Sequence, residues 1–149
     1  TELACYENQL INLNVHGLTS LKELSCSENQ LTSLNVSGLT SLQELNCSEN
    51  QLIELKVQGL TALKELYCYE NRLIALNVSG CSGLKTFYCN GNQINAQAMT
   101  ELLKALPTGE AISKSKALLY TEETGKKEGN VLIGSFMGLK QGACLFMLQ

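Results

Sequence analysis

Residues 24–44 read LSCSENQLTSLNVSGLTSLQE, and this pattern returns every 21 residues along most of the chain. A cysteine recurs at Cys5, Cys26, Cys47, Cys68 and Cys89, and three residues later an asparagine recurs at Asn8, Asn29, Asn50, Asn71 and Asn92. Leucine, valine and glycine keep the same spacing, so the unit reads L-x-x-L-x-C-x-x-N-x-L-x-x-L-x-V-x-G-L-x-x. A fixed period of roughly 20 to 29 residues, rich in leucine, is typical of a solenoid whose stacked copies share one core.

The local pattern predicts a short strand followed by a turn in each copy. Leu24 and Cys26 alternate with polar residues, so both side chains point to one face of a strand. Asparagine favours turns, and in stacked copies its side-chain amide can bond the backbone of the adjacent coil. Leu34 and Val36 also alternate, and we expect a short extended segment on the convex side because 21 residues leave little room for a helix.

The repeats resemble the leucine-rich repeat family, whose core is L-x-x-L-x-L-x-x-N-x-L. The resemblance covers residues 1 to 94, and cysteine stands where the common pattern has leucine. With the 21-residue period, this is most similar to internalin-type bacterial repeats that carry a cysteine ladder. The resemblance implies an α/β fold: a right-handed leucine-rich repeat solenoid, a segment of a horseshoe, with a parallel sheet on its concave face and a C-terminal α/β cap.

The period ends near residue 94, and residues 95–149 are expected to form a capping region within the same continuous domain. Asn95 is expected to cap a helix over residues 96–106, which Pro107 ends. The remaining expectations are a strand over 117–121, a loop over 124–130, a short helix over 132–140 and a strand over 143–148. The tail is similar to secreted repeat proteins of gut anaerobes through Leu106-Pro107, Leu119-Tyr120 and the run Glu128-Gly129-Asn130-Val131. Because Thr1 is not a natural start, we expect the chain to begin inside a larger protein.

Composition narrows the classes of function. The 149 residues, 44% of them hydrophobic, predict one globular domain rather than a disordered chain. The net charge of −3 disfavours a nucleic-acid partner, and no apolar run approaches the roughly 20 residues of a membrane span. His16 is the single histidine and occupies a tolerant polar slot, so we expect it at the surface. No catalytic motif can be assembled, and neither an enzyme nor a cofactor is predicted.

The chain has seven cysteines, an odd number that raises the question of metal or redox chemistry. Zinc ligands converge on one point, whereas these residues are predicted to form a column without nearby histidine. Neighbouring rungs about 4.8 Å apart exceed the roughly 3.8 Å Cβ separation of a disulfide. We therefore expect reduced, buried thiols that fill the core, with Cys81 and Cys144 included. A reducing compartment or an anaerobic surface would suit them equally.

Outward positions of the predicted strands form four columns. We name them the first glutamate column (Glu2, Glu23, Glu44, Glu65, Thr86), the tyrosine column (Ala4, Ser25, Asn46, Tyr67, Tyr88), the third column (Tyr6, Ser27, Ser48, Tyr69, Asn90) and the second glutamate column (Glu7, Glu28, Glu49, Glu70, Gly91). Like charges about 4.8 Å apart repel by about 0.9 kcal/mol per pair even in water, and Lys22, Lys64 and Lys85 are expected to offset part of this. The glutamates either form an acidic groove for basic peptides or amines, or are solvated copies of one residue; we favour the second interpretation.

Tyrosine departs from the copied pattern, since Tyr67, Tyr69 and Tyr88 gather on the fourth and fifth copies. Such a cluster suits either a binding hot spot or cross-strand packing, and the sequence favours neither. The candidate partner-binding residues on the concave face are Tyr67, Tyr69, Tyr88, Asn90, Asn46, Glu44, Glu65, Glu49 and Glu70.

The family resemblance implies a non-enzymatic protein–protein recognition module of a bacterial secreted or cell-surface protein, with a role in adhesion or host interaction. Its partner would be a protein or peptide on the concave face. The alternatives are a structural spacer within a longer surface protein and a glycan-binding module. The alternative location is the cytoplasm. The sequence does not indicate an oligomeric state.

Overall fold

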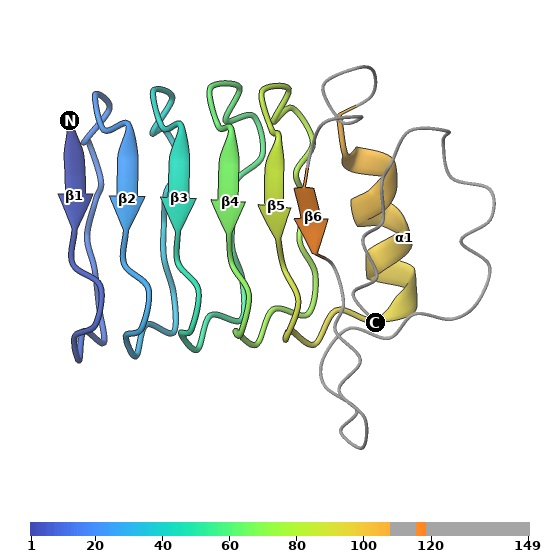
Figure 1. Cartoon of the computed structure of the whole chain (residues 1–149), viewed down its shortest axis with the longest axis horizontal. Coiled ribbons are helices and arrows are strands. Elements are labelled where there is room, and N and C mark those ends of the chain that lie inside the picture. The colour runs from blue at the N-terminus through green and yellow to red at the C-terminus, as the bar shows by residue number, and fades with distance from the viewer. Residues whose placement is uncertain (108–115, 119–149) are drawn as a thin grey trace.

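The structure is a computed structural model that describes residues 1–107 and 116–118, and these residues form a solenoid (Figure 1). Its strands are β1 (Glu2–Ala4), β2 (Glu23–Ser25), β3 (Glu44–Asn46), β4 (Glu65–Tyr67), β5 (Thr86–Tyr88) and β6 (Lys116–Leu118), and its helix is α1 (Ala96–Ala105). The strands lie in chain order in one parallel sheet. The predicted leucine-rich repeat architecture is confirmed.

The register of the sheet follows the 21-residue period without a slip. Leu24 pairs with Leu45, and Leu45 pairs with Leu66. Between β4 and β5, Leu66 pairs with Phe87. Each column seen in the sequence is therefore a physical column in the sheet.

A ladder of cysteines runs through the core, as predicted. Cys26, Cys47, Cys68 and Cys89 have exposed fractions of 0%, and none of the six cysteines in the described part of the chain is in a disulfide. Burial raises the pKa of the Cys26 thiol to about 12 and that of Cys47 well above its ordinary value. These thiols therefore stay protonated and act as small apolar side chains. Cys144 lies outside the described residues.

Asparagine side chains join each copy to the copy before it. The amide nitrogen of Asn50 donates to the carbonyls of Cys26 (3.0 Å), Cys47 (3.3 Å) and Ser48 (3.0 Å), and its Oδ1 accepts from the backbone N–H of Leu31 (2.9 Å). Asn29, Asn71 and Asn92 each reach the preceding copy through the equivalent contacts. Backbone groups that the turn would leave unpaired in the interior are thereby satisfied.

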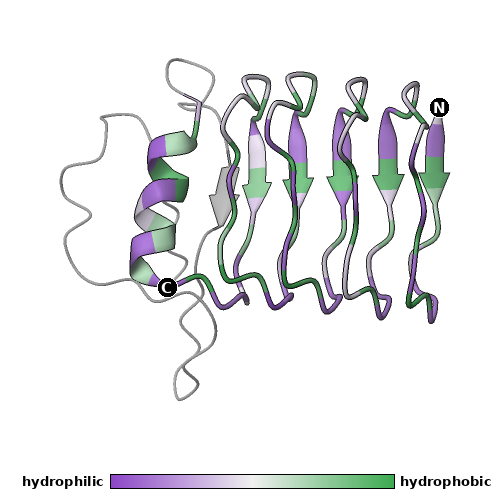
Figure 2. Cartoon of the chain, turned by 180° about the vertical axis from the view of Figure 1, so that it is seen from behind, coloured by the Kyte–Doolittle hydropathy of each residue, from purple (hydrophilic) through white to green (hydrophobic). Residues whose placement is uncertain are grey.

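The chain returns along the back of the sheet in extended segments rather than helices, as predicted (Figure 2). Val36 and Leu34 are buried, with exposed fractions of 0% and 5%, and Leu34 forms a parallel bridge to Leu55. The backbone turns at Gly38, whose φ of 84° lies in the left-handed region that glycine adopts readily.

Beyond the fifth copy, helix α1 begins with Asn95 as its N-cap, as predicted, since Asn95 Oδ1 accepts from the Ala98 N–H at 2.9 Å. The helix ends at Ala105, one residue earlier than expected, because Leu106 precedes Pro107 and takes an extended conformation. Met99 and Leu102 bury the apolar side of the helix. Strand β6 pairs with β5, so the region after the repeats prolongs the sheet.

Strand β6 starts at Lys116, one residue before the predicted strand. The predicted segments 124–130, 132–140 and 143–148 lie outside the described residues. The division into repeats over 1–94 and a cap over 95–149 therefore stays a prediction. Within the described residues, no helix has the length and apolar character needed to cross a membrane.

Substituting Asn50 tests the asparagine ladder. In Asn50→Ala, the Leu31 N–H and the Cys26 carbonyl lose a buried partner, so we expect a loss of about 3 kcal/mol in the free energy of unfolding. Urea denaturation followed by circular dichroism measures this loss. The control is Asn35→Ala, since Asn35 bonds only its own turn through the Ser37 N–H at an exposed site, and we expect about 1 kcal/mol or less. Equal losses in the two variants would contradict the ladder.

Candidate partner-binding face

Four columns of side chains line the side of the sheet opposite the core, and we call this surface the sheet face. In β2, Leu24 is buried whereas its neighbours Glu23 and Ser25 are not, as strand alternation requires. The columns are those predicted from the sequence, with Glu44 paired in register with Glu65 and Tyr67 with Tyr88. The structure thus brings the candidate residues to one side of the sheet, but Asn90, which was expected to face outward, is buried, as are Ser27 and Ser48 of the same column.

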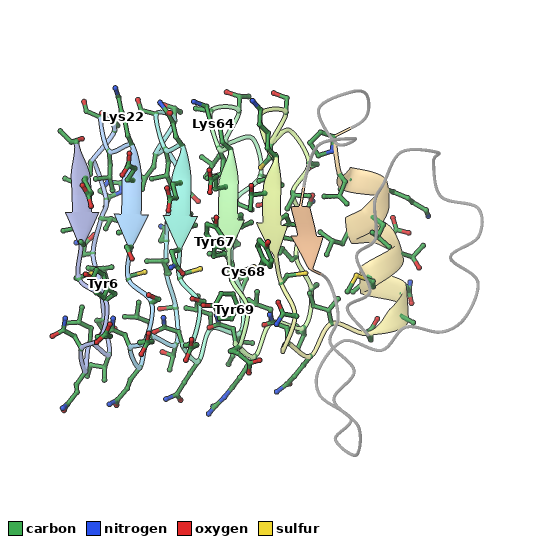
Figure 3. The ribbon with its side chains drawn as sticks, viewed as in Figure 1. Tyr6, Lys22, Lys64, Tyr67, Cys68 and Tyr69 are labelled. Atoms are coloured by element: carbon green, nitrogen blue, oxygen red, sulfur yellow. The ribbon has the colours of Figure 1, made fainter. Side chains whose placement is uncertain are left out.

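Two tyrosines form the aromatic centre of the sheet face. The rings of Tyr67 and Tyr88 stack with centroids 5.5 Å apart and an interplanar angle of 13°. Both side chains are half-buried, and the Tyr67 hydroxyl donates to Glu65 Oε2 at 2.6 Å. Tyr69 lies further along the same rung (Figure 3), outside this ring contact. The stack therefore holds two of the three predicted tyrosines.

Carboxylates of the first glutamate column repel one another. Burial raises the pKa of Glu44 above its ordinary value, and the charges of Glu65, Glu23 and Glu2 raise it further. Burial, the hydrogen bond to Glu65 and the charges of Glu65 and Glu44 also raise the pKa of Tyr67, so its hydroxyl stays a donor. Protonation of Glu44 is thus favoured by its burial and by the neighbouring carboxylates.

Among the described residues, no lysine forms an ion pair with this column. Lys64 Nζ donates to Gln43 Oε1 at 2.8 Å, and Lys22 and Lys64 lie at the upper edge of the sheet in Figure 3. The ion pairs found among residues 1–107 are Lys56–Glu54 (3.3 Å) and Lys104–Glu101 (2.8 Å), both away from the column. Lys64 is thus hydrogen-bonded to a neutral side chain rather than to a glutamate of the column.

The second glutamate column has an unusual backbone that the sequence analysis missed. Glu7, Glu28, Glu49 and Glu70 have φ between 50° and 53°, in the left-handed region that costs a side chain-bearing residue about 1–2 kcal/mol. The conformation turns the following asparagine inward, and Glu28 still bonds on both sides: its N–H donates to the Ser48 carbonyl and its carbonyl accepts from the Asn8 N–H. Gly91 occupies the equivalent position in the fifth copy and has φ of 63°. This glycine is the feature of the sequence that could have indicated a left-handed backbone in the column.

Glu70 and Gly91 of this column are also in contact. A Cβ atom at Gly91 would collide with the carboxylate of Glu70, so that carboxylate lies over the glycine. Glu49 and Glu70 are exposed and lie past the ends of their strands, whereas Glu44 and Glu65 flank the tyrosines. The predicted residues therefore split into a central group and an outer group.

The remaining polar candidates are Asn46 and Asn90. Asn46 Oδ1 accepts from the Ser48 hydroxyl (2.7 Å) and from the Ser48 N–H (3.2 Å). Asn90 follows Tyr88 by two residues and is 9% exposed, and its Oδ1 is the one buried side-chain oxygen in the described region without a hydrogen-bond partner. An acceptor of this kind is costly unless something donates to it.

A groove of about 880 Å³ on the back of the molecule was not predicted. The exposed Ile53 and Ile74 line it together with Ala98 and Ala105 of α1. The same position of the repeat holds isoleucine in three copies, at Ile11, Ile53 and Ile74, and this pattern could have indicated an apolar surface on the back. The charges beside this groove are the two ion pairs described above, so they are already neutralised.

No metal centre is visible among the residues described, where no group of three or more His, Cys, Asp or Glu side chains could hold an ion. His16 is exposed, as predicted. Among the described cysteines, Cys5 is half-buried, against the expectation of a buried thiol, and the other five are buried; burial raises the pKa of each thiol, which disfavours the nucleophilic thiolate form. The chemistry that the sheet face offers is recognition by stacking, hydrogen bonding and charge.

Comparisons with known proteins agree with this architecture. Residues 19–61 match a family of leucine rich repeats in two copies. Among solved structures, the chain is similar to the functional domain of InlJ from Listeria monocytogenes, which includes a cysteine ladder; the TM-score is 0.64 and the sequence identity 28%. The match covers 83% of this chain and 26% of that one, so the chain spans about a quarter of that structure. A search of curated proteins finds no match. The fold is thus an internalin-like leucine-rich repeat solenoid.

Neutralising Glu44 tests the repulsion within the first glutamate column. A raised pKa means that the folded state binds the proton more tightly than the unfolded chain, so ionisation of Glu44 destabilises the fold at neutral pH. We expect Glu44→Gln to melt at a higher temperature than the parent at pH 7. The difference should shrink as the pH falls to about 4, the ordinary range of Glu. Glu101→Gln, which breaks an ion pair, should give no such gain, and a pH-independent difference at Glu44 would contradict the assignment.

Glycine at Glu28 tests the strain in the second glutamate column. Glu28→Gly relieves a left-handed side chain, and we expect a gain of about 0.5 to 1 kcal/mol in the free energy of unfolding, measured in urea. The control is Glu54→Gly, where φ is not positive and glycine should cost a similar amount. Losses of equal size at both positions would show that the glutamate is not strained.

Proposed function

We propose that the sheet face is the recognition surface of a non-enzymatic protein-interaction module, and that this module belongs to a bacterial secreted or cell-surface protein with a role in adhesion or host interaction. The leucine-rich repeat fold and the similarity to InlJ support an interaction module. The surface location and the adhesive role extend the family resemblance and remain part of the proposal.

The stack of Tyr67 and Tyr88 carries this proposal. Tyrosine offers a large contact area with a polar tip at a low cost in conformational entropy, and such residues dominate binding energies at interfaces. The stack is half-exposed on a sheet whose backbone is bonded on both sides through β3, β4 and β5. A ring held this way needs little further ordering when a partner binds.

The second glutamate column supports the same surface. Left-handed backbone at non-glycine residues is uncommon and often accompanies functional surfaces. Here it presents exposed carboxylates along one border of the sheet face, next to the third column. The nine predicted contact residues would then form one footprint, with Tyr67, Tyr88, Glu44 and Glu65 at its centre.

A non-enzymatic role agrees with the side chains that the described region offers. The exposed His16 is remote in sequence from the tyrosines, and the buried thiols are protonated. Activation of a nucleophile requires a base within hydrogen-bond reach, and the hydrogen bond at His16 joins its backbone N–H to Asn14 Oδ1 within the same turn. Recognition without chemistry is the simpler assignment.

Half-exposed tyrosine rings also favour a second candidate, glycan binding, because sugar rings stack on aromatic faces. A third candidate, a structural spacer, predicts no ligand at all. The three candidates separate in binding assays, since they differ in what is captured rather than in how the chain folds.

The double variant Tyr67→Ala/Tyr88→Ala tests the proposed surface. We expect it to lose the proteins that the parent captures from bacterial-surface or host-cell extracts, because the central contact area is gone. The stack itself should cost about 1 kcal/mol of stability, measured by thermal melting. Tyr6→Ala is the matched control, since Tyr6 is 51% exposed on the first rung, and capture should persist.

The parent chain, the double variant and the Tyr6→Ala control are also applied to a glycan array. Capture that is unchanged in the double variant would reject the tyrosine surface. Tyrosine-dependent sugar binding without protein capture would favour the glycan module, and the absence of binding in both assays would favour the spacer.

A further inference from the structure

Three hydrogen-bond donors at or beside the centre of the sheet face are occupied within the chain. The Tyr67 hydroxyl donates to Glu65, and the Ser48 hydroxyl donates to Asn46. Lys64, the basic residue next to this centre in sequence, donates to Gln43. None of these three donors is therefore directed at Glu44, the half-buried carboxylate of this centre.

Two hydrogen-bond acceptors on this side of the sheet, one on Glu44 and one on Asn90, lack a partner of their own in the described region. Glu44 has no ion pair in the part of the chain that the structure describes, although it is half-buried and faces Glu23 and Glu65 in register. The buried Oδ1 of Asn90, two residues beyond Tyr88, also lacks a donor. The groove on the back differs in this respect, because its lysines and glutamates are paired. Within the described residues, the glutamates beside the groove thus have a lysine partner, whereas Glu44 does not.

Acceptors and aromatic rings lie close together here. Glu65 touches Tyr67 through the 2.6 Å hydrogen bond, and the charge of Glu44 is felt at the same hydroxyl. Tyr67 in turn stacks on Tyr88. The carboxylates of Glu44 and Glu65 and the rings of two tyrosines thus lie close together on the neighbouring strands β3, β4 and β5.

From this arrangement we infer that the sheet face binds its partner through an arginine side chain, seated between the carboxylates of Glu44 and Glu65 and the rings of Tyr67 and Tyr88. A guanidinium group presents five donors in a plane, pairs with carboxylates and stacks on aromatic rings. Lysine offers a compact charge that is more strongly hydrated and stacks less well. The inference rests on the proposed function and names the chemistry of the partner: a basic peptide segment that contains arginine.

Charge repulsion within the first glutamate column favours such a ligand. Each pair of like charges about 4.8 Å apart costs about 0.9 kcal/mol in water and more where the site is partly dry. A bound cation removes this repulsion for Glu44 and both of its neighbours at once. The column also attracts basic segments from solution and raises their rate of association.

Fluorescently labelled peptides of defined sequence test the inference. The probe is Gly-Arg-Gly-Arg-Gly, compared by fluorescence polarisation at low salt with the same peptide carrying citrulline, which keeps the shape of arginine but is neutral. We expect the arginine peptide to bind at least about tenfold more tightly. A lysine peptide should bind more weakly than the arginine peptide, because it stacks less well.

Variants of the protein locate the site. Glu44→Gln should weaken binding of the arginine peptide about tenfold, even though it stabilises the fold, so the loss cannot reflect unfolding. Glu28→Gln is the matched control, since it removes the same charge from an exposed glutamate of the same face on another rung, and it should change the affinity by less than about twofold. Equal weakening in the two variants would show nonspecific attraction and would overturn the inference.

Two further outcomes separate this inference from the proposed function. If arginine and citrulline peptides bind equally, or the lysine peptide binds as well as the arginine peptide, the arginine site is rejected. If in that case Tyr67→Ala/Tyr88→Ala still abolishes protein capture, the recognition surface stands and only the chemistry of its partner is wrong. If the double variant leaves capture unchanged as well, both proposals fail.

Discussion

The asparagine ladder is the interaction on which the rest of the structure depends. Each amide group closes the turn of its own copy and bonds the copy before it, as Asn71 does with the carbonyls of Cys68 and Cys47. Its Oδ1 accepts from the Leu52 N–H at 3.0 Å. A shift of one residue would place another side chain in this position and leave several buried backbone groups unpaired. The ladder thereby holds the copies in the 21-residue register, and every column on the sheet face follows from that register.

Other unusual features are consequences of the same ladder. The asparagine must turn inward three residues after a buried cysteine, and the left-handed glutamate before it makes that turn possible. The cysteine contributes its carbonyl to the amide of the next copy, while its small side chain fills the space between rungs. The strain is offset by two backbone hydrogen bonds at each of Glu28, Glu49 and Glu70, and by one at Glu7. A change at one of these three positions therefore acts on the other two.

Periodicity alone was enough to predict the sheet, its register, the buried cysteines and the shared column of Tyr67 and Tyr88. These features depend on which residues recur, and strand alternation decides the face on which each lies. The hydrogen bond of Lys64 to Gln43 could not be predicted from the sequence. The conformations of a flexible lysine side chain differ little in energy, so its hydrogen-bond partner depends on details of the packing. The groove beside Ile53 and Ile74 was missed because it depends on how α1 packs after the repeats end. The left-handed glutamates could have been read from Gly91, the one copy in which glycine takes their place.

Exact repetition has an electrostatic consequence. In a parallel sheet with no register shift, a glutamate in one copy stands directly beside the glutamate of the next, so duplication of the unit also duplicates a repulsion. At Glu44, partial burial and glutamate neighbours on both sides raise the pKa of the carboxyl group. Both glutamate columns stop at the fifth copy, where Thr86 and Gly91 replace the acid, and the aromatic stack lies at this boundary. The sheet face therefore has a direction, with negative charge over the first four rungs and apolar rings at the end. A partner that carries its basic residues on one side of an apolar or planar group would fit this gradient in a single orientation.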